Sequence, residues 1–511
     1  ENIDPQIYRK KSPDFRHLAS LYPDSFGKYV RDDGGFEAKL DFQDPNAVRS
    51  LGETLLKHDF GVDAVLSPSN LCPMIPNRLS YIALIHEVLL HSLLGWELIQ
   101  TGGLQELQAE KDSHRSQRTR IVGLDIGTGA SAIYPLLACA CFPHWCMTGT
   151  DIAESSLDYA HRHIVSPHRN QATLANRSAA AGQGEAAVAE DIEFHFTMCN
   201  PPFYASQEEM AHCADFKAGP PNAVCHGTAG EMVTPGGEVE FISRMIDESA
   251  SAWHEPPAIW YTSMVGKLGS LVPLVQRIKT HMRAGDGCSW GFCELRHGSG
   301  SGRGRTRRWV LLWTWTGLRL PNHLSRSVKS HVVQHCLPSS TERVVTLTPR
   351  LGPLITRREV LAAAYDILCG MDGCTVFPSS TSLFRTRDRT RTRGADGVGE
   401  ETGSLDALLS VDSWTRRYRR QQQQQTSSSQ HSALKRPNPL MITRISVRER
   451  ERNQDDASEG AGLEVKISWI WGRDRVQFES FAMSLVGSIE RKLASHRSHT
   501  TAASATDDIA L

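Results

Sequence analysis

An Asn-Pro-Pro-Phe motif, Asn200 to Phe203, follows directly on an apolar run that predicts a strand over residues 191–199. Two consecutive prolines end a strand, because neither can donate a hydrogen bond to the sheet. The Asn200 carboxamide and the Pro201 carbonyl then stand close together, with the ring of Phe203 or Tyr204 just beyond. The motif is therefore either a stiff turn or a site that holds a flat, nitrogen-bearing ring.

The chemistry that suits this motif is transfer of a methyl group to the exocyclic amine of adenine. That nitrogen is a poor nucleophile, because its lone pair is delocalised into the ring. Asn200 Oδ1 and the Pro201 carbonyl could accept its two N–H bonds and turn the lone pair towards a methyl donor. Pro201 and Pro202 would fix the spacing of the two acceptors. The ring of Phe203 or Tyr204 would stack on the extruded base, and no metal is required.

A glycine turn lies upstream, in LDIGTGAS at residues 124–131, between a predicted strand and a predicted helix. Gly127 and Gly129 allow a ligand to approach the backbone closely, and the helix N-terminus behind them favours an anionic group. Asp151 ends the next predicted strand, where a carboxylate can accept both hydroxyls of a ribose or cap a helix. These residues predict a cofactor that contains a nucleoside, either a dinucleotide or S-adenosylmethionine. The Asn-Pro-Pro-Phe motif favours S-adenosylmethionine.

The elements that must position these residues follow from the pattern after residue 120. Short apolar runs alternate there with helical segments, which is typical of a parallel sheet in a doubly wound α/β domain. Strands are predicted over residues 120–127, 145–151, 191–199, 258–266 and 307–315, and helices over 129–141, 154–165 and 270–282. The stretch 171–190 is rich in Ala, Gly and Gln and is predicted to be a loose loop.

The composition predicts two or three domains, because 511 residues exceed one ordinary core. The net charge of −1 means that any contact with nucleic acid must come from local basic patches. The twelve cysteines lack a paired CxxC arrangement, so neither a metal site nor a structural disulfide is expected. The opening residues are charged and have no apolar core segment, which favours an intracellular, reducing compartment.

The predicted domain boundaries follow changes in composition. Residues 1–75 are predicted to form an N-terminal segment, which the resemblance described below makes an RNA-binding segment, 76–320 the α/β domain, and 321–379 with 438–495 the two parts of a small α+β domain. Residues 380–437 contain RTRDRTRTRG and QQQQQTSSSQ and are predicted to be a disordered insert. A disordered tail is predicted over residues 496–511.

The motifs LDIGTGAS, GTD and CNPPF resemble those of Rossmann-type amino-methyltransferases that depend on S-adenosylmethionine. Further stretches resemble the U6 small nuclear RNA adenine-N6 methyltransferase family, called methyltransferase-like sixteen, to which bacterial ribosomal-RNA adenine-N6 methyltransferases are related. These stretches are KSPDFRHLASLYPDSFGKYV, FQDPNAVRSLGETLLKHDFG, IPNRLSYI, GTAGEMVTPGGEVEFISRMI and GRTRRWVLLW. The resemblance implies a class I fold with a mixed, mostly parallel seven-stranded sheet and helices on both faces. It also implies a location in the nucleus, with the cytoplasm left open.

The resemblance implies roles for individual residues. Arg78 would hold the methionine carboxylate of the cofactor, and Asp151 would hold its ribose in place of the family's glutamate. The cofactor would also be lined by Asp125, Gly127, Gly129, Ser131 and Asn200, and the target adenine would be held by Asn200, Pro201, Pro202 and Phe203. The family's lysine-bearing gating loop should fall within residues 165–190, where this sequence has no lysine.

Basic side chains beside aromatic rings predict contacts with RNA. Arg305, Arg307 and Arg308 precede Trp309 and could contact phosphates, although a solvated hairpin tip would look the same. Lys10, Lys11 and Arg16 alternate with aromatic residues in the N-terminal segment; on composition alone this is an amphipathic surface, and the resemblance makes it an RNA contact. The run RTRDRTRTR at 385–393 could bind phosphates or simply solvate a linker.

Taken together, the sequence predicts an RNA adenine-N6 methyltransferase that uses S-adenosylmethionine, with U6 small nuclear RNA as the favoured substrate. Four alternatives stay open: a ribosomal-RNA adenine-N6 methyltransferase, a protein-glutamine methyltransferase, a DNA-adenine methyltransferase, and a non-catalytic RNA-binding protein. The basic loop before Trp309 and the aromatic N-terminal segment favour RNA, because a protein substrate would not need them.

Overall fold

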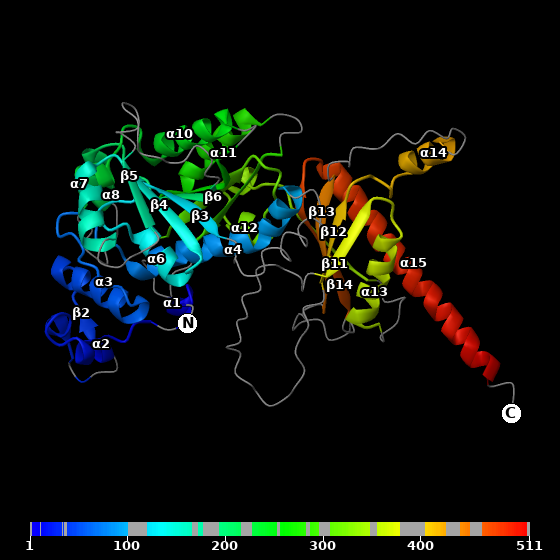
Figure 1. The fold of residues 1–511 in the computed structure, drawn as a ribbon, viewed down its shortest axis with the longest axis horizontal. Coiled ribbons are helices and arrows are strands. Elements are labelled where there is room, and N and C mark those ends of the chain that lie inside the picture. The colour runs from blue at the N-terminus through cyan, green and yellow to red at the C-terminus, as the bar shows by residue number, and fades with distance from the viewer. Residues whose placement is uncertain are drawn as a thin grey trace.

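The computed structural model describes residues 3–10, 12–32, 34, 38–100, 120–165, 172–176, 194–215, 227–252, 256–282, 287–295, 307–347, 355–378, 404–425, 440–449 and 462–507. Figure 1 shows two bodies side by side, each built on its own sheet. The larger body holds the N-terminal part of the chain, and the smaller body holds the C-terminal part.

The sheet of the larger body has seven strands in the order β5-β4-β3-β6-β7-β9-β8. They are β3 (Ile121–Ile126), β4 (Trp145–Asp151), β5 (Ala172–Asn176), β6 (Phe194–Cys199), β7 (Ala258–Val265), β8 (Ser289–Glu294) and β9 (Trp309–Thr314). Strands β3 to β7 pair in parallel, and β9 pairs antiparallel with β7 and β8. The predicted class I fold with a mixed, mostly parallel seven-stranded sheet is confirmed.

Two strands of this sheet differ from the sequence prediction. Strand β5 lies in the stretch 171–190, which was expected to be a loose loop, and β8 follows no clear apolar pattern. Both are edge strands, with one neighbour each. An edge strand is held largely by backbone hydrogen bonds to that neighbour, so it needs little hydrophobic sequence. Because β5 intervenes, β6 is the fourth strand of the sheet in chain order.

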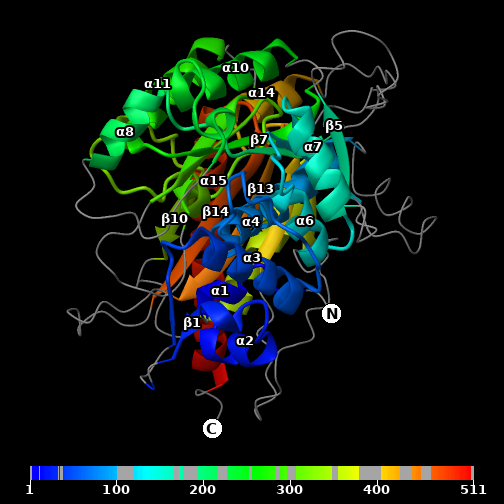
Figure 2. The same ribbon diagram turned by 90° about the vertical axis from the view of Figure 1, so that its left-hand side faces the viewer.

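Helices cover both faces of the sheet, as Figures 1 and 2 show. They are α4 (Ile75–Gln100), α6 (Ile133–Cys141) and α7 (Glu154–Ala160) with its π-helical extension (His161–Val165), and α10 (Gly237–Ser251) and α11 (Leu271–His281). The short helices α8 (Gln207–Asp215), α9 (Ala229–Met232) and α12 (Asn322–Ser325) lie in the connections. Helices α4 and α6 share one buried cluster with the sheet, and α10 and α11 share another. Within the described ranges, no helix is long and apolar enough to cross a membrane.

The N-terminal segment is part of the same core. It contains α1 (Ile7–Lys10), α2 (Phe15–Leu21), a hairpin of β1 (Val30–Arg31) and β2 (Lys39–Leu40), and α3 (Pro45–Phe60). Helix α3 begins where the side chain of Asp44 accepts from Asn46 N, and it ends at Gly61 in the left-handed conformation. The side chains of Tyr8, Leu18 and Phe26 are buried in the cluster that includes α4 and α6. The segment is therefore an integral layer on the α4 side and not a separately folded unit.

The smaller body has an antiparallel sheet of five strands in the order β10-β14-β13-β12-β11. They are β10 (Glu342–Thr346), β11 (Cys374–Pro378), β12 (Ser404–Leu409), β13 (Met441–Glu449) and β14 (Leu463–Gly472). Helices α13 (Arg357–Cys369) and α15 (Arg475–Asp507) contribute to the same buried cluster, and α14 (Arg416–Gln425) follows β12. Helix α13 begins with a capping box between Thr356 and Glu359.

Two predictions of disorder are wrong for the part that the structure describes, while residues 380–403, 426–437 and 508–511 lie outside the described residues. Strand β12 and helix α14 fall inside the predicted insert of residues 380–437, and α15 continues to Asp507 through most of the predicted tail. Strand β12 is an inner strand, and Ala407 and Leu409 are fully buried there. The run SLDALL is too short to stand out between polar low-complexity segments, although its pairing with β11 and β13 makes it part of the core.

The two bodies are joined by direct contacts. Trp471 Nε1 donates to the Thr316 carbonyl at 2.8 Å, and Arg319 donates to the carbonyls of Cys288 at 2.7 Å and Gly472 at 2.8 Å. A Cβ on Gly317 would lie 2.7 Å from Trp471 Nε1, and Gly317 has a φ of 89°, so this crossing requires glycine.

We expect Leu409→Ala to lower the free energy of unfolding of the smaller body by about 2–5 kcal/mol, because it removes a fully buried side chain from an inner strand. Val476→Ala on α15, where the side chain is 74% exposed, is the matched control and should change it by less than about 0.5 kcal/mol. Chemical denaturation of the two variants checks this. Equal stability would mean that β12 is not part of the core.

Candidate functional site

The carboxyl ends of β3, β4, β6 and β7 meet at one edge of the large sheet, where open α/β sheets bind their ligands. The glycine turn at the end of β3 is tied to β4, because Gly127 N and Thr128 N both donate to the Thr150 carbonyl, at 2.8 and 2.9 Å. Gly127 and Gly129 have φ values of 77° and 64°. A Cβ on Gly127 would meet nothing within 4 Å, so the space above the turn is open.

Asp151, at the end of β4, holds this turn in place. Its Oδ2 accepts from Gly129 N at 2.9 Å, and its Oδ1 accepts from Ala153 N at 2.9 Å. Ala153 is the residue before α7. The N-cap of α7 is Ala153, without a side-chain cap, so the helix-cap role expected of Asp151 is wrong, and the carboxylate instead holds the backbone on either side of it. Each oxygen keeps a further lone pair, and the side chain is partly exposed, which leaves room for the other role.

Asp125 is the most unusual ionisable group at this edge. It is fully buried in β3, and within the described residues neither of its carboxylate oxygens makes a hydrogen bond of full geometry, although the Thr128 hydroxyl lies close enough to lower its pKa. Burial raises the pKa of Asp125 to about 7, with a further rise from the charge of Asp151, while Thr128 and Arg78 act in the opposite direction. A donor on a bound ligand would supply the partner that these oxygens lack.

Arg78, in the first turn of α4, faces the same region. Its Nη1 donates to the Tyr134 hydroxyl at 2.9 Å and lies 3.8 Å from Met264 Sδ, and its guanidinium lies 5.5 Å from the centre of the Tyr134 ring. The Nε atom of Arg78 is buried and has no hydrogen-bond partner. The guanidinium is thus positioned by an aromatic residue of α6 and keeps unused donor capacity. Ser131 is partly buried just before α6.

The Asn-Pro-Pro-Phe motif stands at the end of β6, between β3 and β7. Tyr81 anchors this end of the strand, because its buried hydroxyl bonds Thr262 Oγ1 at 2.7 Å and lies 3.5 Å from Cys199 N. Asn200 Oδ1 is buried, and no residue in the described part of the chain donates a hydrogen bond to it. A buried amide oxygen without a donor costs roughly 1–3 kcal/mol, so this atom is suited to a donor that arrives with a ligand.

Phe203 and Tyr204 have different surroundings. The Arg308 guanidinium lies 4.9 Å from the centre of the Phe203 ring. Tyr204 is fixed through its backbone, since its N–H donates to the Met232 carbonyl at 3.2 Å and its carbonyl accepts from Thr234 N at 3.0 Å. Lys267 Nζ lies 5.6 Å from the centre of the Tyr204 ring and pairs with Glu209. Both rings therefore carry a cation over one face, and Tyr204 is in addition fixed through its backbone.

Two glutamates of the site were not found by sequence reasoning. Glu238 is 2% exposed and accepts from Gly266 N at 2.6 Å, Lys267 N at 3.0 Å and Ser270 Oγ at 2.7 Å. Burial raises its pKa, and these hydrogen bonds oppose the rise. It therefore fixes the loop after β7 that packs against Phe203. The available signal was an acidic residue in the first turn of the helix that follows VTPG.

The second such residue is Glu231. It accepts from Leu71 N at 3.1 Å and from Thr228 N at 2.7 Å, and a Cβ on Gly129 would lie 3.7 Å from its Oε1. It thus joins the loop before α4 to α9, beside the glycine turn. Neither glutamate belongs to a familiar short motif, so spacing alone did not single them out.

The structure describes only some of the predicted RNA-binding residues. Lys11 and Arg305 lie outside the described residues, and Lys10 is in α1 with its side chain not described. Arg16 pairs with Asp32 at 2.7 Å, and Arg307 pairs with Glu294 at 3.2 Å, so both charges are partly neutralised on the surface. Of the three predicted residues whose side chains the structure describes, Arg308 is the one that lies at the Asn-Pro-Pro-Phe motif. The stretch of 165–190 without lysine lies mostly outside the described residues.

This fold and this edge of the sheet define a class I methyltransferase, with a glycine turn after the first strand and an Asn-Pro-Pro-Phe motif after the fourth. A family model described as RNA methyltransferase matches residues 2–317. The chain belongs to this RNA methyltransferase family, and its methyl donor is S-adenosylmethionine.

The curated relatives agree with this assignment and confirm the resemblance seen in the sequence. A U6 small nuclear RNA (adenine-(43)-N(6))-methyltransferase from Schizosaccharomyces pombe is 32% identical over 318 residues, which cover 61% of this chain and 71% of the relative. The human RNA N(6)-adenosine-methyltransferase METTL16 is 32% identical over 319 residues, which cover 60% of this chain and 49% of the relative. The matched region thus spans about half the length of the human relative.

Among solved structures, the human METTL16 catalytic domain in complex with MAT2A 3'UTR hairpin 1 is 31% identical and covers 62% of this chain and 96% of its own, with a TM-score of 0.47. The N-terminal domain of human METTL16 in complex with SAH is 28% identical and covers 61% of this chain and 97% of its own, with a TM-score of 0.43.

We expect Gly266→Ala to lower methyl transfer to RNA by up to about a hundredfold, the effect of displacing a positioning group by an ångström. The new Cβ would lie 2.6 Å from Phe203 Cδ1 and would displace the ring. Gly269→Ala in the same loop is the matched control, because a Cβ there would meet nothing within 4 Å. Initial rates of methyl transfer check this, with thermal unfolding of both variants as a test of folding. Equal rates would show that the position of Phe203 is unimportant.

We also expect wild-type protein, without cofactor, to lose stability relative to Asp125→Asn as the pH rises from about 4 to about 7. In this range the carboxyl group ionises in the unfolded chain and stays protonated in the fold, so the unfolded state binds fewer protons and is favoured by rising pH. Thermal unfolding of both proteins from pH 4 to 8 checks this. Parallel curves would contradict the burial of an unpartnered carboxylate.

Proposed function

We propose that this chain transfers a methyl group from S-adenosylmethionine to the exocyclic amine of an adenosine in a structured RNA, most favourably U6 small nuclear RNA. The observation that carries the proposal is the buried Asn200 Oδ1 without a partner at the carboxyl end of β6. An acceptor in this state matches an amine N–H of the substrate.

The reaction depends on positioning. Asn200 Oδ1 and the Pro201 carbonyl accept the two N–H bonds of the adenine amine, so its lone pair leaves the plane of the ring. Phe203 stacks on the base, which must be extruded to reach the site. The Arg308 guanidinium lies beyond the Phe203 ring at 4.9 Å and holds that ring in place. Pro202 restricts the backbone between the acceptors and the ring.

The cofactor site is supported by the same kind of unused polar atom. Arg78 Nε, both carboxylate oxygens of Asp125, and Thr128 Oγ1 are buried beside the glycine turn, and no hydrogen bond to them is made by the residues that the structure describes. They fit a ligand that carries both acceptors and donors. We assign Arg78 to the methionine carboxylate, Asp151 to the ribose, and Asp125, Gly127, Gly129, Ser131 and Asn200 to the lining of the site. When bound, the cofactor supplies an electrophilic methyl group on a sulfonium.

The choice of RNA rests on relatives and on local charge. The relatives from Schizosaccharomyces pombe and Caenorhabditis elegans are named U6 small nuclear RNA methyltransferases, at 32% and 30% identity. Arg308 lies directly at the Asn-Pro-Pro-Phe motif, and Arg16 and Arg307 are exposed, although each would have to give up its carboxylate partner, Asp32 or Glu294, to bind a phosphate. With such a substrate, we propose that the protein acts in the nucleus, with the cytoplasm left open.

We expect Asn200→Ala to abolish methyl transfer while RNA binding stays within about threefold of wild type, because one amide contributes little to a phosphate-dominated interface. Asn46→Ala is the matched control, since Asn46 is exposed at the start of α3. Tritiated methyl transfer and gel-shift binding, measured on the same preparations, check this. Full activity of Asn200→Ala would exclude the acceptor role.

The substrate itself is identified by tritiated methyl transfer onto total cellular RNA, followed by sizing and digestion of the labelled species. Label in an RNA of the size of U6 supports the proposal, and label in ribosomal RNA would redirect it to the ribosomal alternative. Parallel reactions with DNA and with protein extract test the remaining alternatives, because label there and not in RNA would contradict the proposal.

A further inference from the structure

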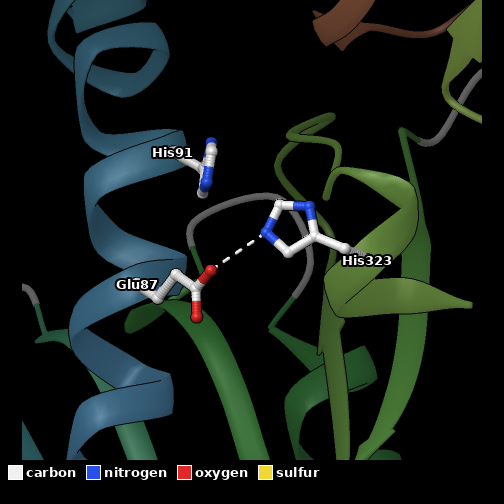
Figure 3. Close-up of side chains that lie close together, drawn as sticks. All are labelled: Glu87, His91 and His323. Atoms are coloured by element: carbon white, nitrogen blue, oxygen red, sulfur yellow. Dashed lines mark hydrogen bonds and ion pairs between the residues drawn. The ribbon is translucent and has the colours of Figure 1, made fainter. Parts of the chain in front are cut away.

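Three potential metal ligands come together away from the methyl-transfer site. Glu87 and His91 lie one turn apart on the same side of α4, and His323 in α12 faces both, as Figure 3 shows. One ligand atom from each residue lies within 4.8 Å of the others. His323 Nε2 lies 2.9 Å from Glu87 Oε1, and the rings of His91 and His323 are 5.3 Å apart. The sequence predicted no metal site, because Glu87 and His323 are 236 residues apart.

His91 is the member of this group with unused capacity. Its side chain is only partly exposed, and within the described part of the chain neither of its ring nitrogens makes a hydrogen bond. A partly buried imidazole normally bonds through at least one nitrogen. Here it instead lies beside a paired carboxylate and imidazole, which is the arrangement expected of a ligand set without its ion.

The group is also accessible to an ion and its water. A cavity of about 410 Å³ is bordered by Glu87 and His323. Arg9, Cys293 and Glu294 border it as well. An ion can therefore enter from the cavity, and a water molecule can complete its coordination from that side.

We propose that Glu87, His91 and His323 bind one zinc ion, with water from the cavity as the fourth ligand. Two imidazoles and one carboxylate are a ligand set that zinc prefers, in tetrahedral geometry. On binding, the hydrogen bond between His323 and Glu87 is replaced by bonds from both residues to the ion, and the proton that it used leaves to solvent or moves to the other ring nitrogen of His323.

Nearby charges limit the choice of ion. Arg9 acts electrostatically on Glu87, and Arg444 and Lys466 act on His91. These cations oppose a bound ion that is held by charge alone, as Mg²⁺ or Ca²⁺ would be with oxygen ligands. Zinc gains its affinity from the imidazole nitrogens and is the better match.

The ion would act as a structural link. Helix α4 carries Arg78 at its N-terminal end, and α12 begins the connection from the large sheet to the smaller body. Zinc at this place would fasten that connection to α4 without touching Asn200 or Phe203. The inference therefore stands independently of the proposed methyl transfer.

The test is titration of the full chain, stripped of metal by a chelator, with Zn²⁺ and separately with Mg²⁺. We expect one equivalent of zinc to bind and Mg²⁺ to leave the protein unchanged. His91→Ala, His323→Ala and Glu87→Gln should each weaken zinc binding by more than about tenfold, since even residues behind the ligands contribute this much. His331→Ala, with an exposed histidine, and Asn200→Ala should bind zinc like wild type.

Cobalt distinguishes this site from binding to cysteine. With Co²⁺ we expect the visible absorption of a tetrahedral nitrogen and oxygen site, without a thiolate charge-transfer band. Circular dichroism of each variant shows whether it is folded, and Glu87→Gln preserves the shape of the side chain. Zinc binding by His91→Ala and Glu87→Gln with wild-type affinity, or a thiolate band with Co²⁺, would overturn the inference.

Discussion

Asn200 Oδ1 lies buried at the end of β6 with no hydrogen-bond donor among the described residues, and both carboxylate oxygens of Asp125 lie in the same state at the end of β3. Each such atom costs roughly 1–3 kcal/mol while it stays unpaired. The fold tolerates this cost at the edge where the parallel strands end and where side chains of separate strands converge. A ligand that brings donors to these atoms recovers the cost, so binding and orientation of the ligand follow from the same constraint. The chemistry needs little else, because the reaction depends on the direction of one lone pair.

The surrounding carboxylates keep this arrangement rigid. Asp151 accepts from Gly129 N and Ala153 N, and so fixes the glycine turn to the start of α7. Glu231 accepts from Leu71 N and Thr228 N, and Glu238 accepts from Gly266 N, Lys267 N and Ser270 Oγ. All three use acceptor oxygens to hold loop backbone, which otherwise has few partners. The position of Phe203 thus depends on Glu238 through Gly266, although Glu238 does not itself reach the motif.

The inner strands of the large sheet could be predicted from the sequence, and so could the residues at the ends of those strands. The inner strands are long and apolar, and Asn200, Asp151 and the glycine turn each belong to a recognisable pattern. Edge strands β5 and β8 were missed because backbone pairing with one neighbour supports them. Strand β12 was missed because six residues between polar segments give too little periodicity. Glu238 and the group of Glu87, His91 and His323 were missed because they depend on contacts between distant parts of the chain.

The central claim is that Asn200 Oδ1 accepts a hydrogen bond from the exocyclic amine of the target adenine. The most direct test compares two hairpin RNAs that differ only at the methylated position, one with adenosine and one with purine riboside, which lacks the amine. Their affinities for wild type and for Asn200→Ala are measured in the presence of S-adenosylhomocysteine. The claim predicts that wild type binds the adenosine RNA more tightly and that Asn200→Ala loses this preference. The same preference in both proteins would contradict it.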